Sequence, residues 1–467
     1  MAAQWGQLTA GEMTIPIRGE LINGDPATVF EGLSTDSRQM RPGFLFVAIK
    51  GERFDGHQFV DRAVAEGATG IVIQKGVRPS VSPPGSPAVI AVDDTLTALG
   101  DLAAWWRHQH RVQVVAVTGS IGKTTTKEMA AAILARGAKT LKNEGNLNNL
   151  IGLPLTLFLL ENQHRRAVLE MGMNRPGEIG RLTEIADPEV GLITNVARVH
   201  LEGLANLDGV AKAKVELVGK ISPQATVLLN GDDDILIKAA SRFQKKIVTF
   251  GLGPRNEVRA HRVRQLGREG VSLEIEYRGE STPVRLHVPG LQHVRNAVAA
   301  AAIALALDTP RDQIAAGLER YAGVKGRFML KALACGATVI DDTYNSNPAS
   351  LRAALDSAKA LKGETGRVIV GLGEMLELGA ETVPAHREAG SLVAEIGANA
   401  FLVLGEHAGE MLEGAVEAGL PADRVTIVTS HEEMTHRIRE EMRPGDLILL
   451  KGSRRIGLER VIEGLQE

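Results

Sequence analysis

A short glycine-rich segment between a strand pattern and a helix pattern constrains the fold most. Residues 114–118 read Val-Val-Ala-Val-Thr, a run typical of a buried strand, and Gly-Ser-Ile-Gly-Lys-Thr-Thr follows at 119–125. The next ten residues favour a helix. Backbone N–H groups and a helix N-terminus at such a turn attract phosphate. The segment therefore predicts a parallel α/β sheet with a nucleotide phosphate site at one strand end.

The loop departs from the common phosphate-loop template. That template has a glycine six places before the lysine, but here the place holds Val117, and Gly119 is only three residues before Gly122. A glycine turn carrying a solvated lysine is the alternative interpretation. In the nucleotide interpretation, Lys123 reaches the β- and γ-phosphates and Thr124 places a hydroxyl on Mg²⁺.

Composition narrows the class of protein. The chain has 467 residues, which suggests about three domains. A net charge of −3 without a long basic run gives no sign of a nucleic-acid partner. The single cysteine excludes an internal disulfide framework. We expect no signal peptide, no membrane span and a cytoplasmic location, because the start lacks a basic and apolar leader and the apolar run 297–307 is too short to cross a bilayer.

Changes of pattern divide the chain into three α/β domains. We predict a smaller N-terminal α/β domain at 1–93, a central parallel-sheet domain with the phosphate loop at 94–324, and a doubly wound C-terminal domain at 325–467. Period-two patches between residues 257 and 288 predict a small antiparallel addition to the central domain.

Polar residues follow the predicted central strands. Glu170 ends one strand, where ligands gather in open α/β sheets, although it could be a solvated acid. His200 follows the next strand, and imidazole is an unusual magnesium ligand, so a structural histidine is the alternative. Lys214 lies in a lysine-rich helix, a pattern that usually marks a solvated face.

The predicted C-terminal domain begins with a second polar cluster. In the segment 339–351, a strand pattern ends in Asp341 and Asp342, followed by Tyr344, Asn345 and Asn347. Asn347-Pro348 can cap the helix that follows, so part of this cluster is a helix start. Arg327 lies at the predicted hinge, where an arginine can reach a phosphate across a cleft or remain a solvated linker charge.

Taken in order, these segments resemble the Mur ligase family, and within it the MurF type. The resemblance rests on "STDSRQMRPGFLFVAIKGERFDGHQF" (34–59), "TGSIGKTTTKEM" (118–129), "NEGNLNNLIGLPLTL" (143–157), "LEMGMNRPGEI" (169–179), "ITNVARVHLEG" (193–203), "AKAKVEL" (211–217), "DDTYNSNP" (341–348), "GEMLELG" (373–379) and "LLKGSRRIGLERV" (449–461). The phosphate loop of this family reads Thr-Gly-x-x-Gly-Lys-Thr/Ser, which residues 118–124 match.

The resemblance implies roles for individual residues. It implies catalytic roles for Lys123, Lys214, His200 and Arg327, and magnesium contacts for Thr124, Glu170, His200 and Lys214, with two ions and Lys214 carried as a carbamate. ATP contacts are implied for Thr118, Gly119, Ser120, Ile121, Gly122, Lys123, Thr124, Thr125, Asn230, Asn296, Arg327 and Asp342. Substrate contacts are implied for Thr35, Ser37, Arg38, Asn146, Asn149, Tyr344 and Asn345.

One segment departs from the family pattern. The adenine-side helix of the family starts Gly-x-His-Asn-x-x-Asn, whereas residues 290–296 read Gly-Leu-Gln-His-Val-Arg-Asn. Gln292 and His293 therefore replace the expected histidine and asparagine, while Asn296 keeps its place.

As a function, the resemblance implies a monomeric ATP- and Mg²⁺-dependent ligase that adds D-alanyl-D-alanine to UDP-N-acetylmuramoyl-tripeptide in peptidoglycan precursor synthesis. The sequence lacks the Asp-Asn-Pro-Arg tetrapeptide of the diaminopimelate-adding relatives. Two alternatives remain open: another amide ligase of the same fold, such as a folylpolyglutamate or different Mur enzyme, and a P-loop nucleotide switch or transport ATPase.

Overall fold

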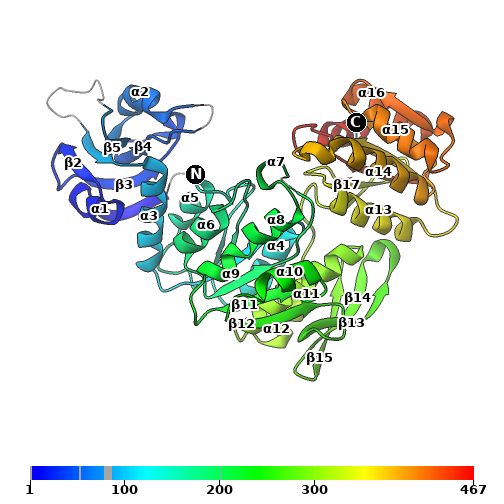
Figure 1. The fold of residues 1–467 in the computed structure, drawn as a ribbon, viewed down its shortest axis with the longest axis horizontal. Coiled ribbons are helices and arrows are strands. Elements are labelled where there is room, and N and C mark those ends of the chain that lie inside the picture. Colours follow the sequence, from blue (N-terminus) through cyan, green and yellow to red (C-terminus); the bar gives the residue numbers. More distant parts are fainter. Residues whose placement is uncertain (1–2, 52–53, 78–86, 200, 467) are drawn as a thin grey trace.

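Three α/β domains follow one another along the chain (Figure 1). The computed structural model describes residues 3–51, 54–77, 87–199 and 201–466. The N-terminal and C-terminal domains lie at opposite ends of the central domain. The predicted fold class is confirmed by this architecture. In the part of the chain that is described, no helix has the length and apolar character to cross a membrane.

The N-terminal domain is built on a six-stranded sheet with the order β1-β3-β4-β5-β6-β2. The four inner strands are parallel, and β1 and β2 are antiparallel edges. The elements are β1 (Ala3–Thr9), α1 (Ala10–Ile17), β2 (Glu20–Asn23), β3 (Val29–Ser34), β4 (Phe44–Val47), α2 (Val60–Ala65), β5 (Ala68–Gln74) and β6 (Ala88–Val92).

The central sheet has nine strands in the order β15-β14-β13-β12-β11-β10-β7-β9-β8. The strands are β7 (Gln113–Thr118), β8 (Thr140–Lys142), β9 (Arg166–Glu170), β10 (Val190–Ile193), β11 (Thr226–Asn230), β12 (Lys246–Gly251), β13 (Val258–Gln265), β14 (Val271–Tyr277) and β15 (Glu280–Leu286). The predicted antiparallel addition is present as β13–β15. It extends the parallel sheet at its edge, because β13 pairs in parallel with β12.

Helices cover both faces of the central sheet (Figure 1). They are α3 (Thr95–His108), α4 (Lys123–Leu134), α5 (Gly152–Leu157), α6 (Glu178–Ala186), α7 (Leu201–Leu204), α8 (Leu207–Lys214), α9 (Glu216–Lys220), α10 (Asp234–Ala240), α11 (Leu291–Ala306) and α12 (Arg311–Glu319). The α11 helix is buried from Ala297 to Ala304, as its alanine-rich sequence predicts.

The C-terminal domain has a six-stranded sheet with the order β16-β17-β21-β18-β19-β20, in which only the edge strand β16 is antiparallel. Its elements are β16 (Met329–Ala332), β17 (Thr338–Asp342), α13 (Pro348–Lys362), β18 (Val368–Gly373), α14 (Thr382–Glu395), β19 (Ala400–Leu404), α15 (Ala408–Glu417), β20 (Val425–Val428), α16 (His431–Glu441), β21 (Leu447–Lys451) and α17 (Glu459–Gln466). The predicted cap is confirmed: Asn347 accepts the Ser350 N–H at 2.9 Å.

Buried apolar side chains connect the first two domains and leave the third separate. One continuous cluster runs from Phe30 of the N-terminal sheet through Leu99 of α3 to Leu217 beneath the central sheet. The C-terminal sheet has its own clusters on its two faces. The helix α3 is therefore a rigid connection, whereas the link at 320–328 contains glycines and no regular element.

Polar contacts seat the C-terminal domain on the central one. The Arg268 guanidinium donates to Thr338 Oγ1 at 2.9 Å and to the Gly445 carbonyl at 3.0 Å. Ser357 on α13 donates to Gln292 Oε1 at 2.5 Å. The domain is thus held where the antiparallel addition and α11 meet its sheet.

Candidate functional site

The backbone conformation of the phosphate loop requires its two glycines. Gly119 has φ +144° and Gly122, the N-cap of α4, has φ +83°. A Cβ at Gly119 would lie 1.8 Å from Thr194 Oγ1, and one at Gly122 would lie 2.3 Å from Asn296 Oδ1. Both positions therefore demand glycine for conformation and for space. The N-terminus of α4 is left open to an anion.

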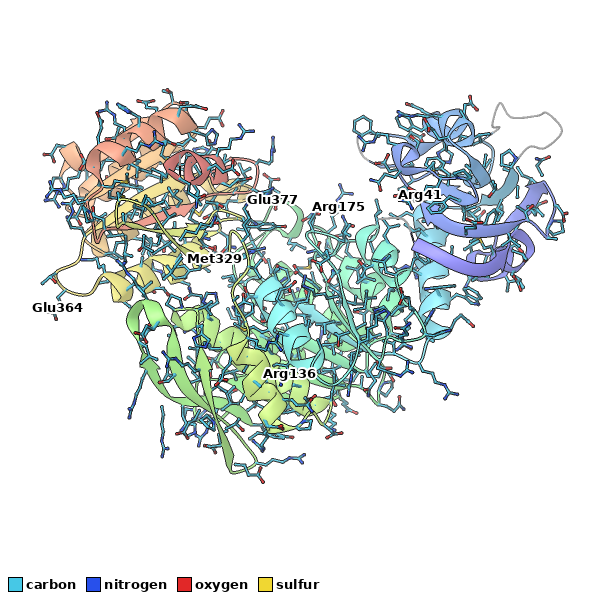
Figure 2. The ribbon with its side chains drawn as sticks, turned by 180° about the vertical axis from the view of Figure 1, so that it is seen from behind. Arg41, Arg136, Arg175, Met329, Glu364 and Glu377 are labelled. Atoms are coloured by element: carbon cyan, nitrogen blue, oxygen red, sulfur yellow. The ribbon has the colours of Figure 1, made fainter. Side chains whose placement is uncertain are left out.

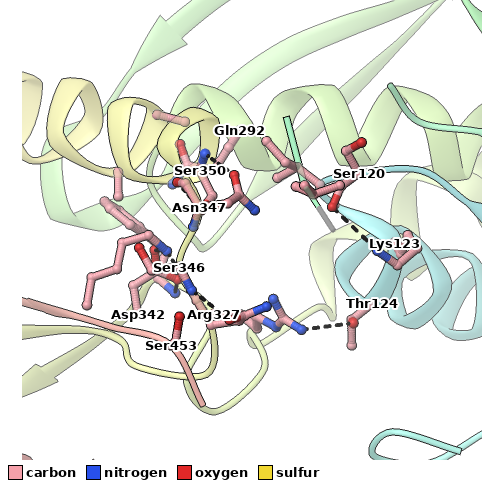
Figure 3. A pocket seen from close by; sticks show the side chains of 18 of the residues that line it. Ser120, Lys123, Thr124, Gln292, Arg327, Asp342, Ser346, Asn347, Ser350 and Ser453 are labelled. Atoms are coloured by element: carbon pink, nitrogen blue, oxygen red, sulfur yellow. Dashed lines mark hydrogen bonds and ion pairs between the residues drawn. The ribbon is translucent and has the colours of Figure 1, made fainter. Parts of the chain in front are cut away.

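Lys123 begins α4 and folds back over this loop. Its ammonium donates to the Gly119 carbonyl at 2.8 Å and lies 3.4 Å from the Ser120 carbonyl (Figure 3). Desolvation lowers the pKa of Lys123, Glu170 raises it, and Arg327 lowers it. A desolvated cation beside carbonyl groups is held ready for phosphate oxygens.

The strand-end loop after β10 fixes the phosphate loop from one side. Asn195 Oδ1 accepts the Ile121 N–H at 2.9 Å, and Thr194 Oγ1 donates to the Ile121 carbonyl at 2.6 Å. Asn230 donates from Nδ2 to the Thr194 carbonyl at 2.9 Å. Asn230 thus supports the loop that holds Thr194. It does not line the cleft that lies between the phosphate loop and the C-terminal domain. Its predicted adenine contact stays a prediction.

A cleft of about 270 Å³ lies between the phosphate loop and the C-terminal domain. We call it the nucleotide cleft. Figure 3 shows its lining side chains, drawn from α4, α11, the hinge and the start of α13. The predicted ATP contacts that line it are Ser120, Ile121, Gly122, Lys123, Thr124, Thr125, Asn296, Arg327 and Asp342. Thr118 is fully buried and instead donates to the Met171 carbonyl at 2.9 Å.

Arg327 crosses from the hinge to the phosphate loop. Its NH2 group donates to Thr124 Oγ1 at 3.3 Å (Figure 3), and its guanidinium lies 4.0 Å from the centre of the Tyr344 ring. Stacking on an aromatic face fixes the plane of the guanidinium. Among the residues that the structure describes, the buried Nε of Arg327 has no hydrogen-bond partner. The group therefore retains a donor for an incoming anion.

Sequence reasoning missed a buried lysine in this cleft. Lys451, at the end of β21, is 2% exposed and donates to Asp342 Oδ2 at 2.6 Å and to the Asn345 carbonyl at 2.9 Å. Burial lowers the pKa of Lys451, and Asp342 raises it. Asp342 also accepts the Phe328 N–H at 3.1 Å. The ion pair between Lys451 and Asp342 thus connects the hinge to the ends of β17 and β21. In the sequence, the one indication of this site was a lysine at the end of an apolar strand pattern.

A second pocket, of about 510 Å³, adjoins the nucleotide cleft. Lys123, Arg327 and Asn345 line both spaces. Four more of the predicted residues line the second pocket: Asn146, Asn149, Glu170 and Tyr344. The structure thus brings together predicted residues from four widely separated parts of the sequence.

Glu170 is held in this pocket by asparagines that the sequence did not single out. Asn143, which is 2% exposed, exchanges two hydrogen bonds of 2.9 Å with the Glu170 backbone. Asn148 donates to Glu170 Oε1 at 2.9 Å, while Oε2 is buried without a partner among the described residues. A fixed carboxylate with one oxygen that has no partner among the described residues fits a hard cation such as Mg²⁺.

Lys214 is buried, contrary to the usual pattern of a lysine-rich helix. It is 2% exposed. Burial lowers its pKa well below the ordinary value, and Lys123 lowers it further. Lys212, on the other side of α8, is exposed and pairs with Asp208 at 2.7 Å. His200 lies outside the described residues.

The predicted contacts in the N-terminal domain lie apart from both spaces. Ser37 is buried, and Arg38 is exposed and pairs with Asp36 at 2.8 Å, which lowers the pKa of Asp36 to about 2. Neither these residues nor Thr35 line the two pockets. Figure 2 shows Arg41 of the same domain across the opening from Glu377 of the C-terminal domain. The structure therefore has the outer domains apart.

The two residues that depart from the family pattern have structural contacts. His293 is buried, and its Nδ1 lies 2.8 Å from the Pro289 carbonyl while its ring contacts Phe328 edge-on at 6.2 Å between centres. Gln292 accepts the Ser357 hydroxyl. Both line the nucleotide cleft, and both join α11 to the hinge or to α13.

Comparisons with known families cover nearly the whole chain. Residues 29–107 match "Mur ligase family, catalytic domain", residues 117–304 match "Mur ligase middle domain", and residues 326–454 match "Mur ligase, glutamate ligase domain". The matches follow the order of the three sheets.

Individual relatives agree over full length. UDP-N-acetylmuramoyl-tripeptide–D-alanyl-D-alanine ligase of Escherichia coli strain K12 is 36% identical, over 98% of each chain. The Bacillus subtilis strain 168 protein of the same name is 35% identical, over 97% of this chain and 96% of that one. A crystal structure of MurF from Acinetobacter baumannii superposes with a TM-score of 0.89 at 34% identity and 99% coverage of both chains. MurF from Thermotoga maritima, solved with ADP, gives 0.83 at 27% identity, over 93% of this chain and 96% of that one. With these domains, this order and these relatives, the chain belongs to the Mur ligase family.

Proposed function

We propose that this chain is an ATP-dependent ligase that joins D-alanyl-D-alanine to UDP-N-acetylmuramoyl-tripeptide. One observation carries the proposal: the nucleotide cleft and the second pocket meet at the side chains of Lys123, Arg327 and Asn345. A phosphoryl group bound at the loop would therefore face a substrate in the neighbouring space. The names of the relatives supply the two substrates.

The chemistry explains why two spaces must meet. A carboxylate does not acylate an amine, because oxide would have to leave. In the proposed reaction a carboxylate oxygen of the tripeptide attacks the γ-phosphorus of ATP and ADP departs, leaving an acyl phosphate. The amine nitrogen of the dipeptide then attacks the acyl carbon, loses a proton, and phosphate leaves. Lys123 and Arg327 would position the phosphoryl group and neutralise its charge.

The metal part of the proposal has two magnesium ions. Thr124 and Glu170 would hold them, with His200 and a carbamate formed on Lys214. Bound Mg²⁺ would supply positive charge to the phosphate oxygens. The Glu170 Oε2, which has no partner among the described residues, and the buried surroundings of Lys214, which favour a neutral amine, support this assignment. Carbon dioxide adds only to a neutral amine, and the lowered pKa of Lys214 increases that form.

Each domain would have its own task. Residues 1–93 would bind the UDP-sugar-peptide through Thr35, Ser37 and Arg38, residues 94–324 would bind ATP, and residues 325–467 would bind the dipeptide near Tyr344 and Asn345. Because the outer domains lie apart, turnover would need closure at the hinge. We further propose a monomer in the cytoplasm that completes the peptidoglycan precursor.

The test is product analysis with the full chain. ADP release should require both UDP-N-acetylmuramoyl-tripeptide and D-alanyl-D-alanine, and the product should have the mass of the pentapeptide. Tripeptides that end in lysine and in diaminopimelate should both be tried. Release without an amine would favour a P-loop ATPase, and release with a single amino acid and a shorter nucleotide peptide would favour a different Mur ligase.

A further inference from the structure

A segment of the C-terminal domain forms one wall of the nucleotide cleft. It runs from Met375 to Thr382, between β18 and α14, and we call it the wall segment. Its residues Leu376, Glu377 and Leu378 line the cleft. On its outer side, the Glu377 carbonyl accepts the Leu201 N–H at 3.1 Å. The wall segment therefore borders the cleft and also contacts α7 of the central domain, and Figure 2 places Glu377 at that boundary.

Both ends of the wall segment meet one buried imidazole. Met375 N–H donates to His386 Nε2 at 3.0 Å, and His386 Nδ1 lies 2.7 Å from the Thr382 carbonyl. A carbonyl can only accept, so Nδ1 carries the hydrogen, and Nε2 can accept the Met375 N–H only when it has none. These partners specify the neutral Nδ1–H form of His386, whose side chain is fully buried.

We propose that His386 is a positioning residue for the nucleotide cleft, because its neutral ring holds both ends of the wall segment in place. The inference rests on the proposed use of that cleft for ATP. A protonated ring carries hydrogen on both nitrogens, so Nε2 would confront the Met375 N–H, donor against donor. Acid would then release the wall segment and weaken nucleotide binding, while neutral and alkaline conditions would keep the cleft formed.

The groups around His386 determine the pH at which its ring becomes protonated. The His407 ring, just before α15, lies against the His386 ring at a tilt of 37° with 4.7 Å between centres, and Glu410 of α15 lies 3.3 Å from His407 Nδ1. Burial lowers the pKa of His386 and His407 lowers it further, whereas the Thr382 carbonyl, Glu374 and Glu410 raise it. Because the pKa of His386 is lowered overall, its ring stays neutral somewhat below the ordinary histidine pKa of about 6.5. We therefore expect the loss of nucleotide affinity at a pH below that value.

The test is Mg²⁺·ADP affinity of the full-length protein between about pH 5 and 8. Three proteins are compared: wild type, His386→Gln and His407→Gln. Gln can place an amide oxygen where Nε2 lies but cannot be protonated. Wild type and His407→Gln should lose about tenfold in affinity relative to His386→Gln as the pH falls, the size expected for one unmatched buried donor. Taking differences between proteins at each pH cancels titration of the nucleotide.

The proposal is overturned if His386→Gln loses affinity in acid as wild type does, or if His407→Gln becomes pH-insensitive instead. A measurement on wild type alone covers the case in which His386→Gln does not fold. Amides of a peptide that covers the wall segment should be protected from hydrogen exchange at neutral pH, relative to an unstructured peptide at the same pH, and should lose that protection in acid before global unfolding. Equal protection at both pH values would refute the inference. If ADP binds but no pentapeptide forms, the proposed function fails and the positioning role of His386 stands.

Discussion

The buried amine of Lys214 offers the most discriminating perturbation of the site. Lys214→Met keeps an unbranched apolar stem, with sulfur in place of one methylene, and removes the buried ammonium, which has Lys123 nearby. If Lys214 is an unmodified lysine, this change should leave the free energy of unfolding unchanged or raise it, since isolated buried charges are destabilising. Lys214→Ala also deletes three buried methylenes at ~0.8 kcal/mol each, so it should cost about 2.4 kcal/mol.

If Lys214 carries a carbamate, the same variants should fail in catalysis. Both lose the anionic oxygens, and removal of one preorganised charge typically slows turnover by about 10²–10³-fold, or ~3–4 kcal/mol. Acetate or formate should partly restore Lys214→Ala, because a small carboxylate fits the vacated space and supplies the same oxygen atoms. It should not restore Lys214→Met, whose side chain fills that space.

The assay is ADP release with both substrates, with and without added acetate, alongside denaturant unfolding of each variant. Lys212→Ala is the matched control, because Lys212 lies two residues away on the exposed face and pairs only with Asp208 among the described residues. It should stay within about 0.5 kcal/mol of the wild-type stability and keep full turnover. Wild-type turnover in Lys214→Met would refute the carbamate assignment.

Other variants test other parts of the site. Lys123→Ala should abolish ADP release while keeping the wild-type unfolding midpoint, and normal turnover would remove the phosphate-loop assignment. Arg38→Ala should raise the Kd of the UDP-sugar-peptide and leave the KM of the dipeptide unchanged. Tyr344→Ala, which removes the ring that contacts Arg327, should instead raise the KM of the dipeptide or slow domain closure. Identical effects of both variants on the UDP-sugar-peptide alone would contradict the proposed division of tasks between the domains. Lys451→Met leaves a partly buried carboxylate unpaired and should cost about 3 kcal/mol of stability in denaturant titrations, and an unchanged midpoint would show that the ion pair is not needed.

Local patterns predicted the elements that carry the phosphate loop, because an apolar strand followed by obligatory glycines leaves few alternatives. Glu170 could be placed for the same reason, since a strand end in a parallel sheet lies at the ligand-binding edge. The ion pair between Lys451 and Asp342 could not be predicted, because 109 residues separate its partners. The edge strand β2 was also missed, because its largely exposed residues give no apolar alternation. Burial of Lys214 depends on tertiary packing that a helix pattern does not encode.

The shared apolar cluster beneath α3 also determines how the chain should come apart. Leu99 of α3 lies in the same cluster as residues of both the N-terminal and the central sheet, so neither sheet can lose its packing without exposing part of the other. The C-terminal domain meets the rest through a few polar contacts, the ring contact of Phe328 with His293, and a hinge segment with Gly323 and Gly326 at positive φ. Calorimetry should therefore resolve two melting units in a chain of three domains, and brief proteolysis should cut first near these glycines. The same asymmetry leaves the C-terminal domain as the part of the molecule that is free to swing.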